Sequence, residues 1–319
     1  APIINFGEFD NIVQDSNIYS SSDVVIIFWE LNNIVDGFQY SSTKLTADQI
    51  KEYLEKVKTE IKFCINSLSK TSLVLFNNFS SNPFSLNNSQ TDNYEKIGIE
   101  LNSFINKILP DNFKLVNIDK IISCISIEKS YNMRNFYTSK SPYSFDFFSN
   151  YLNYISPILS AKIGATKKVL VLDCDNTLWG GILGEDGVNG VKCDDMSGAG
   201  KVFYEIQELI VQLIKKGVIV CLNSKNNLKD VEEVFNKKSM PLNYDDIIIK
   251  KVNWVNKASN LIDISNELNV GIESLVFIDD SDFEINLIRE SLPTVKTMQV
   301  PKDIYKYPLE FRRLRNVFT

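Results

Sequence analysis

Apolar runs alternate with amphipathic segments along the first half of the chain. Short β-branched runs at 23–29, 72–76 and 114–119 predict buried strands. Amphipathic segments at about 46–68, 95–109 and 144–161 predict helices; a capping box at Thr46 and Gln49 opens the first, and Pro157 kinks or splits the last. Strands separated by helices indicate a parallel sheet covered on both faces.

The second half has a cleaner alternation of the same kind. Strands are predicted at 169–173, 218–223, 247–250, 275–279 and 295–298, and helices at about 201–216, 227–237, 256–268 and 283–291. A polar stretch at 162–168 separates the halves, so we expect domains at 1–164 and 165–319. The pattern predicts an α/β protein with two doubly wound parallel-sheet domains, whose ligands bind at the carboxyl ends of the strands.

Composition narrows the chemistry. The net charge of −6 argues against a nucleic-acid binder, and no uncharged apolar run reaches the roughly 18 residues of a membrane span. Five scattered cysteines suggest reduced thiols and a cytoplasmic protein. The chain contains no histidine, which excludes Ser-His-Asp and Cys-His catalysis and zinc bound by histidine.

Two carboxylates follow the first strand of the second half. Asp173 and Asp175 lie one residue apart, and on an extended chain such residues face the same side. We therefore expect them to converge on one point beyond the strand. Carboxylates held so close repel each other unless a cation relieves them, and Mg²⁺ is the natural choice for oxygen ligands.

Further polar residues follow the other strands. Asp279 and Asp280 lie at the carboxyl end of one predicted strand, Ser224 follows another, and Lys257 lies at the start of a predicted helix. Each has an ordinary alternative: an acidic pair before a helix is usually a cap, Ser224 alone a helix cap, and Lys257 alone a surface lysine. The signal is that all of them occur in order at successive strand ends, where they predict a site for metal and phosphate.

This set resembles the haloacid dehalogenase-like (HAD) phosphohydrolase superfamily, and within it the FkbH-like branch. The motifs are LDCDNTLWGGILGEDG (172–187), NSKNN (223–227), NWVNKASNL (253–261) and LVFIDDSDFE (275–284). The first half resembles, less specifically, the SGNH-hydrolase-like domain that precedes the HAD domain in that family. Without histidine that half cannot carry the usual SGNH triad, so we expect it to be catalytically silent.

The resemblance implies a role for each matching residue. Asp173 is the nucleophile that forms an aspartyl-phosphate, and Asp175 is the general acid and base. Mg²⁺ lies between the Asp173 carboxylate, the Asp175 backbone carbonyl and Asp280, with Asp279 orienting the metal shell. The phosphoryl oxygens are held by the three remaining motif residues, Thr177, Ser224 and Lys257.

FkbH-like proteins are glyceryl transferase/phosphatases. The resemblance implies removal of phosphate from 1,3-bisphosphoglycerate, a small phosphorylated three-carbon substrate, and transfer of the glyceryl group to the phosphopantetheine arm of an acyl carrier protein. A cysteine holds the acyl group in between. Cys174 is the first candidate, although position i+1 on a strand should point away from the site; Cys193, in the following loop, is the second.

The segment 178–200 is glycine-rich and is expected to form a mobile flap with Trp179 as a lid. It is too short for a helical cap domain, so the site should be open to a group carried on a macromolecule. Two alternatives remain: a capless HAD phosphatase acting on another phosphorylated molecule or protein, and a non-catalytic module that docks a carrier protein.

Overall fold

A computed structural model of the chain describes residues 13–82, 84–85, 90–196 and 198–318. It divides into two compact units, one ending at Ser156 and the other beginning at Pro157. The division falls inside helix α9 (Phe145–Lys162), whereas the polar stretch at 162–168 predicts a boundary near residue 164. Helix α9 continues through Pro157 as one helix, so the predicted split at this proline is wrong.

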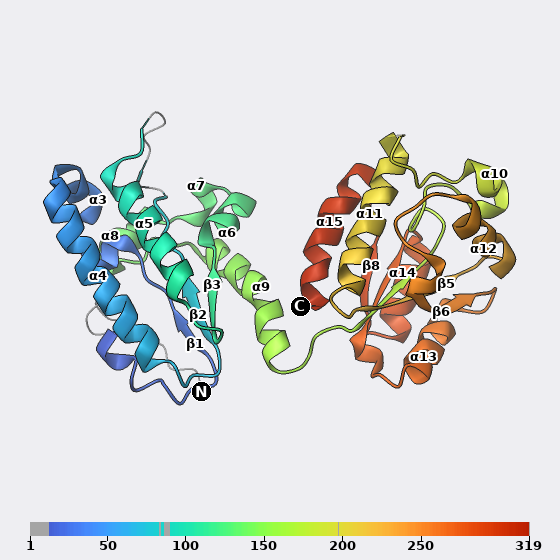
Figure 1. Ribbon diagram of the computed structural model, residues 1–319, viewed down its shortest axis with the longest axis horizontal. Coiled ribbons are helices and arrows are strands. Elements are labelled where there is room, and N and C mark those ends of the chain that lie inside the picture. The colour runs from blue at the N-terminus through green and yellow to red at the C-terminus, as the bar shows by residue number, and fades with distance from the viewer. Residues whose placement is uncertain (1–12, 83, 86–89, 197, 319) are drawn as a thin grey trace. The chain divides into compact units, whose positions relative to one another are not determined.

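The first unit is built on a parallel three-stranded sheet with the order β1-β2-β3 (Figure 1). The strands are β1 (Val25–Ile27), β2 (Val74–Asn77) and β3 (Phe113–Val116). The helices before α9 whose bounds the described residues give are α2 (Leu31–Ile34), α3 (Phe38–Ser41), α4 (Ala47–Ser67), α5 (Asn93–Ile108), α6 (Ile118–Ile125), α7 (Ile127–Ser130) and α8 (Met133–Ser139), with a 3-10 turn at Ser42–Lys44. The apolar pattern of the sequence does not predict α2, α3 and α6–α8, which are short.

Helices α4 and α5 form the main cover of this sheet. Their buried residues recur every three or four positions, as in Leu54, Val57 and Ile61, and pack in one cluster with Val74 and Phe76 of β2. Thr46 accepts the Gln49 N–H at the start of α4, so the predicted capping box is present. Thus α4 forms where apolar periodicity and a cap coincide.

Two buried polar side chains, Asn77 and Glu30, lie near the carboxyl end of β1. Asn77 accepts the Trp29 N–H and donates to the Trp29 carbonyl, which joins the ends of β1 and β2. The next residue, Glu30, accepts a 2.7 Å hydrogen bond from the Tyr143 hydroxyl. Burial raises the pKa of Glu30 to about 8; the Tyr143 bond lowers it and the Asp119 carboxylate raises it further. Glu30 is therefore protonated at neutral pH.

The second unit has a five-stranded parallel sheet with the order β6-β5-β4-β7-β8. The strands are β4 (Val169–Leu172), β5 (Ile219–Ser224), β6 (Ile247–Val252), β7 (Leu275–Asp279) and β8 (Lys296–Gln299). The helices are α10 (Leu183–Gly190), α11 (Gly198–Ile214), α12 (Leu228–Lys237), α13 (Lys257–Glu267), α14 (Asp282–Ser291) and α15 (Tyr307–Leu314). Four 3-10 turns occupy Tyr244–Asp246, Ile272–Ser274, Ile304–Lys306 and Arg315–Phe318.

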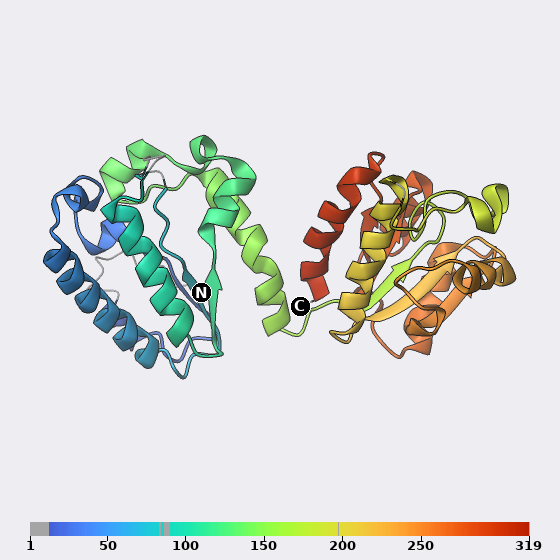
Figure 2. The ribbon, with the colours of Figure 1, turned by 45° about the horizontal axis from the view of Figure 1, so that its top comes forward.

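Helices cover both faces of this sheet. Alternate residues of β4 point to opposite sides: Leu170 and Leu172 join one apolar cluster, and Val169 and Val171 join another. The first cluster includes residues of α11, α12 and α15, and the second includes residues of α13 and α14. Helices α11 and α15 run side by side in both views (Figures 1 and 2). The helices thus hold the strand ends in fixed positions.

The predicted α/β class with parallel sheets is confirmed. In the second sheet the chain moves from β4 to β5 and β6 on one side, and then to β7 and β8 on the other. This reversal beside β4 is the switch point at which doubly wound sheets bind ligands. None of the described helices is both long and apolar enough to cross a membrane.

Replacement of Glu30 by glutamine should remove a pH dependence from the first unit. The wild-type carboxyl prefers its protonated form when folded, so its stabilising contribution is complete below the unfolded pKa of 4.5 and is lost as pH rises toward about 8. The slope for one proton is at most about 1.4 kcal/mol per pH unit. Amide hydrogen exchange in β2, measured from pH 5 to 8, should show this slope in the wild type and not in Glu30→Gln. The exposed Glu52→Gln is the control and should keep it; a slope unchanged in Glu30→Gln would contradict the assignment.

Candidate active site

Three strand ends and one helix start meet at the switch point. Asp173 directly follows the central strand β4, Ser224 ends β5 on one side, and Asp279 ends β7 on the other. Lys257 is the first residue of α13, whose start is capped by Asn256 accepting the Ala258 N–H at 2.7 Å. Neighbouring parallel strands end at the same edge of the sheet, which gathers residues that lie far apart in sequence.

Asp173, Asp279 and Asp280 form a compact carboxylate cluster. One oxygen from each lies within 4.8 Å of the others. Asp173 and Asp279 are buried, and Asp280 is half-buried. Three carboxylates so close repel one another strongly where the dielectric constant is low. The cluster is therefore stable only with positive charge nearby or with some of its carboxyl groups protonated.

Lys257 supplies part of that charge from within the protein. Its ammonium lies 2.9 Å from Asp173 Oδ1 and 2.6 Å from Asp279 Oδ2. The lysine is only 4% exposed, so it is not the surface lysine of the alternative interpretation. Burial by itself lowers the pKa of Lys257, but the two carboxylates outweigh burial and raise it above its ordinary value. Lys257 therefore stays cationic between them.

Burial and neighbouring charges also set the pKa values of the three carboxyl groups. Burial raises the pKa of Asp173 to about 6, with Lys257 lowering it and Asp279 raising it. Burial likewise raises the pKa of Asp279 against the effect of Lys257, and raises the pKa of Asp280 together with the Asp173 charge. One ammonium does not fully offset three carboxylates, which leaves room for a further cation.

Asp175 has a different environment. Its Oδ1 accepts the Trp179 indole N–H at 3.0 Å and the Leu183 N–H at 3.1 Å, and its Oδ2 accepts the Asn226 amide at 3.1 Å. Its carboxylate is not among the three of the cluster. Asp173 thus meets Asp279 and Asp280 in the carboxylate cluster, whereas neutral donors hold the Asp175 carboxylate.

Side-chain amides form a scaffold under these residues. The Asn223 amide donates to the Lys257 carbonyl at 2.9 Å, and Asn260 donates to Asn223 Oδ1 at 3.0 Å. Asn226 donates to the Ser224 hydroxyl at 3.2 Å as well as to Asp175. The roles predicted from the motifs do not include these asparagines. The sequence does carry a signal for them. Asn223 and Asn226 lie at or just after an apolar strand, and Asn260 lies on the helix that starts with Lys257. An amide buried at such a position is costly unless it has hydrogen-bond partners.

The start of the glycine-rich segment 178–200 is held in place by a tight turn. Asn176 and Gly181 have positive φ angles of 50° and 105°, and the Gly181 N–H donates to Asn176 Oδ1 at 3.0 Å to close a tight turn. Trp179 is fully buried, and Leu183 begins helix α10. The expectation that Trp179 forms a lid is wrong, because its ring belongs to the core and its N–H positions Asp175.

The two candidate cysteines lie in the core. Cys174 continues the face of β4 that carries Leu170 and Leu172, and Cys193 joins the same apolar cluster. Burial, followed by the Asp173 charge, raises the pKa of Cys174 well above its ordinary value. Burial also raises the pKa of Cys193. Both are thiols in a packed environment, and neither is presented to solvent.

Thr177 is fully buried, and its hydroxyl has no hydrogen-bond partner among the residues that the structure describes. Its assignment to phosphate binding stays a prediction, as do the roles of Ser224 and Lys257 toward phosphate. The structure brings Asp173, Asp279, Asp280 and Lys257 into contact, and it links Ser224 to Asp175 through Asn226.

One solved structure resembles the chain over both units. It is the N-terminal part of the protein BF1531 from Bacteroides fragilis, which contains a phosphatase domain and was crystallised with Mg. The TM-score is 0.77 at 26% identity, over 96% of this chain and 83% of that chain. Together with the motifs, this likeness supports the HAD superfamily. It does not identify the FkbH-like branch.

A second solved structure is much less similar to the chain. A HAD family enzyme from Bacteroides thetaiotaomicron, in complex with magnesium and inorganic phosphate, aligns with 43% of this chain and 96% of its own at 11% identity; its TM-score of 0.31 is too low to identify a shared fold. No protein-family model matches the chain. No curated protein matches it either.

The donor set of this site suits a hard divalent cation. The ligand atoms available are carboxylate oxygens, with no histidine in the chain and with the nearest cysteine, Cys174, buried in the apolar cluster. Mg²⁺ prefers such oxygens and binds proteins through one or two carboxylates with water in its other positions. Asp173 and Asp280 fit that requirement. Both oxygens of Asp279 are already engaged, Oδ2 by Lys257 and Oδ1 by the Ser281 N–H, whereas Lys257 contacts only Oδ1 of Asp173.

Replacement of Lys257 by methionine should destabilise the second unit in the absence of divalent cations. The change leaves Asp173 and Asp279 buried without their partner, which costs about 3–5 kcal/mol. Added Mg²⁺ should restore part of the loss, since it supplies charge to the same carboxylates. Thermal unfolding with EDTA and with Mg²⁺ measures both effects.

The control for this experiment is Lys229→Met, which removes an exposed lysine from helix α12 and should change stability by no more than about 0.5 kcal/mol. An equally small change in Lys257→Met would mean that the buried ion pairs do not hold the cluster together.

Proposed function

We propose that the chain is an Mg²⁺-dependent phosphatase of the HAD type. The observation that carries this proposal is the cluster of Asp173, Asp279 and Asp280 within 4.8 Å, with Lys257 bridging two of them at the carboxyl edge of the sheet. The likeness to a phosphatase domain crystallised with Mg supports it. Binding alone would not require buried carboxylates beside a buried lysine, which disfavours a non-catalytic docking module.

Asp173 and Asp175 divide the chemistry. An Asp173 carboxylate oxygen attacks phosphorus, the bond to the leaving oxygen breaks, and Asp175 gives that oxygen a proton. Asp175 then takes a proton from a water, which attacks the phosphorus of the aspartyl-phosphate and releases inorganic phosphate with Asp173 restored. The different environments of the two side chains support these roles. Asp173 is buried beside the charged groups of Lys257, Asp279 and Asp280, whereas Asp175 accepts hydrogen bonds from neutral donors.

Charge explains why an anion would approach a carboxylate here. Mg²⁺, bound by Asp173 and Asp280, would neutralise the phosphoryl oxygens and the carboxylates together. Lys257 contributes a fixed positive charge between Asp173 and Asp279. We propose that Ser224 and Thr177 supply hydroxyl groups to the phosphoryl oxygens.

The finer proposal is transfer of a glyceryl group from 1,3-bisphosphoglycerate to an acyl carrier protein. An acyl phosphate is activated, so a thiol can displace phosphate and keep the acyl group. Two features support a macromolecular acceptor. Among the residues described between β4 and α11, the only helix is α10, which is too short to cap the site. Large apolar side chains in the segments after β4–β7 are exposed: Ile182, Leu228, Trp254, Val255 and Phe283.

Burial of the two candidate thiols disfavours formation of a thioester on the enzyme. Acylation of Cys174 would require movement of the first motif, since this side chain packs in the core and burial raises its pKa. A phosphatase that never forms an enzyme thioester is therefore the second candidate function. The two candidates differ in a covalent product and can be separated directly.

Phosphate release should depend on both the metal and Asp173. We expect Mg²⁺-dependent release of inorganic phosphate from acyl phosphates or phosphate esters, abolished by EDTA. Asp173→Asn should lower kcat by at least about 10³-fold, since the nucleophile is lost. Asp230→Asn, on the exposed side of α12, is the matched control. If the wild type released no phosphate with Mg²⁺, or Asp173→Asn stayed active, the docking-module alternative would gain.

Intact-mass spectrometry after incubation with 1,3-bisphosphoglycerate tests transfer. A glyceryl adduct that forms on the wild type and is absent from Cys174→Ala supports the thioester route through Cys174; an adduct lost only in Cys193→Ala assigns it to Cys193. Release of phosphate with no adduct on any cysteine favours the phosphatase.

A further inference from the structure

Three buried side-chain atoms form no hydrogen bond among the described residues of the second unit. They are Thr177 Oγ1, Glu284 Oε2 and the Tyr307 hydroxyl oxygen. Thr177 belongs to the first motif, and the other oxygen of Glu284 pairs with Lys225 at 2.6 Å. Tyr307, the first residue of α15, lies in none of the motifs. A hydroxyl buried without a partner is costly, so this one indicates a partner that comes from outside the chain.

Packing fixes the ring of Tyr307. The residue is fully buried, and its ring meets those of Phe203 and Phe311 edge to face, with centroid distances of 6.4 Å and 6.3 Å. Both neighbours belong to the apolar cluster on this face of the sheet, as does Cys174, the residue next to Asp173. The Tyr307 hydroxyl is therefore held in the interior and does not reach bulk solvent for a partner.

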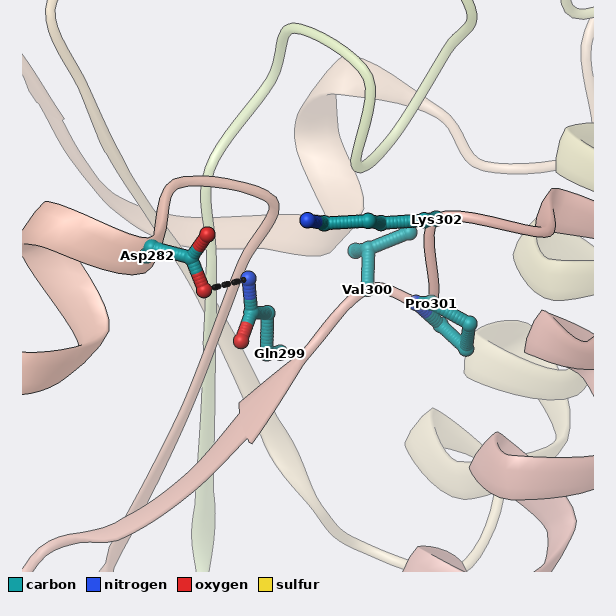
Figure 3. Close-up of a pocket in the computed structure, with 5 residues that line it drawn as sticks. All are labelled: Asp282, Gln299, Val300, Pro301 and Lys302. Carbon is teal, nitrogen blue, oxygen red and sulfur yellow. Dashed lines mark hydrogen bonds between the residues drawn. The ribbon is translucent and has the colours of Figure 1, made fainter.

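The segment that leads into α15 is bonded to the strand end that carries the acidic pair. Gln299 is the register partner of Asp279, and the Val300 N–H donates to the Asp279 carbonyl at 2.9 Å. The Gln299 amide also donates to Asp282 Oδ1 at 2.6 Å, a bond drawn in Figure 3. Val300 then packs in the same apolar cluster as Tyr307. The start of this segment is thus fixed beside the carboxylates.

The charges of the carboxylate cluster act on the Tyr307 hydroxyl. Burial raises the pKa of Tyr307, and the three carboxylates of the cluster raise it further, that of Asp173 most. The hydroxyl nevertheless forms no direct hydrogen bond with any of them. Polar groups that interact from beyond bonding distance are commonly bridged by a water molecule.

A bound Mg²⁺ would place water at such a position. Mg²⁺ binds proteins through one or two carboxylates and keeps water in its other positions. A water molecule on a cation donates its protons to nearby acceptors, and a phenolic oxygen is an acceptor. Groups that hold the ligands of a metal in this way typically contribute about 10- to 100-fold to its affinity.

We propose that Tyr307 is a positioning residue of the metal site, whose hydroxyl accepts a hydrogen bond from a water molecule bound to Mg²⁺. The inference rests on the proposed Mg²⁺-dependent function and adds a residue that contacts neither the metal nor the phosphoryl group. Its effect should therefore fall on the affinity for Mg²⁺ and not on kcat at saturating Mg²⁺.

Tyr307→Phe tests this role, because it removes the hydroxyl and keeps the packed ring. Calorimetric titration of the full chain with MgCl₂ should give an affinity about three- to tenfold below that of the wild type, as for one hydrogen bond. Thermal unfolding in EDTA should be nearly the same in both proteins, because the hydroxyl has no partner in the described chain to lose. Tyr305→Phe, which removes an exposed hydroxyl two residues away, is the control and should keep the wild-type affinity.

Equal Mg²⁺ affinities in the wild type and Tyr307→Phe would overturn the inference and leave the proposed function standing. A loss of stability in EDTA as large as that in Mg²⁺ would also overturn it, since the hydroxyl would then serve packing alone. A wild type that bound no Mg²⁺ would overturn both proposals. At saturating Mg²⁺, both proteins should bind inorganic phosphate equally; a loss confined to phosphate would overturn the inference by placing the hydroxyl at the phosphoryl group.

Discussion

The second unit depends on one electrostatic constraint: three carboxylates share a space of 4.8 Å, largely out of contact with water. Lys257 satisfies part of it by bridging Asp173 and Asp279. A lysine buried to this degree is tolerated only because two carboxylates compensate its loss of hydration. The arrangement is therefore mutually dependent, and the remaining negative charge defines a cation site.

The sheet order turns this constraint into geometry. Strand β4 lies between β5 and β7, so residues that are about 50 and 100 positions apart in sequence reach one edge of the sheet. Asparagine amides fix the parts that charge alone would not hold. Asn223 fixes the backbone of Lys257, and Asn226 joins Ser224 to Asp175. Two aspartates one residue apart thereby receive different environments, which is the condition for different roles in catalysis.

The strands could be predicted because their apolar runs are short, β-branched and bounded by polar loops, and all five of the second sheet occur close to the predicted positions. The cluster could be anticipated in part, because acidic pairs at the ends of two parallel strands must approach each other. The short helices α6–α8 could not, since elements of four to eight residues carry too little periodicity.

Other features of the site follow from packing that the sequence does not reveal. The period-two pattern placed Asp175 beside Asp173, but it does not reveal that the N–H groups of Trp179, Leu183 and Asn226 hold the Asp175 carboxylate. The glycines after Trp179 suggested mobility, yet the ring of Trp179 is buried and donates to Asp175. The burial of Lys257 likewise depends on Asp173 and Asp279, both of which lie more than 20 residues away in sequence.

A crystal structure of the full chain with Mn²⁺ and a phosphate mimic tests the central claim most directly, because Mn²⁺ can be located by its anomalous scattering. The account predicts one anomalous peak at the switch point, bonded to carboxylate oxygens of Asp173 and Asp280, with the mimic beside it and Lys257 still between Asp173 and Asp279. A peak bound elsewhere, or none at saturating Mn²⁺, would contradict it.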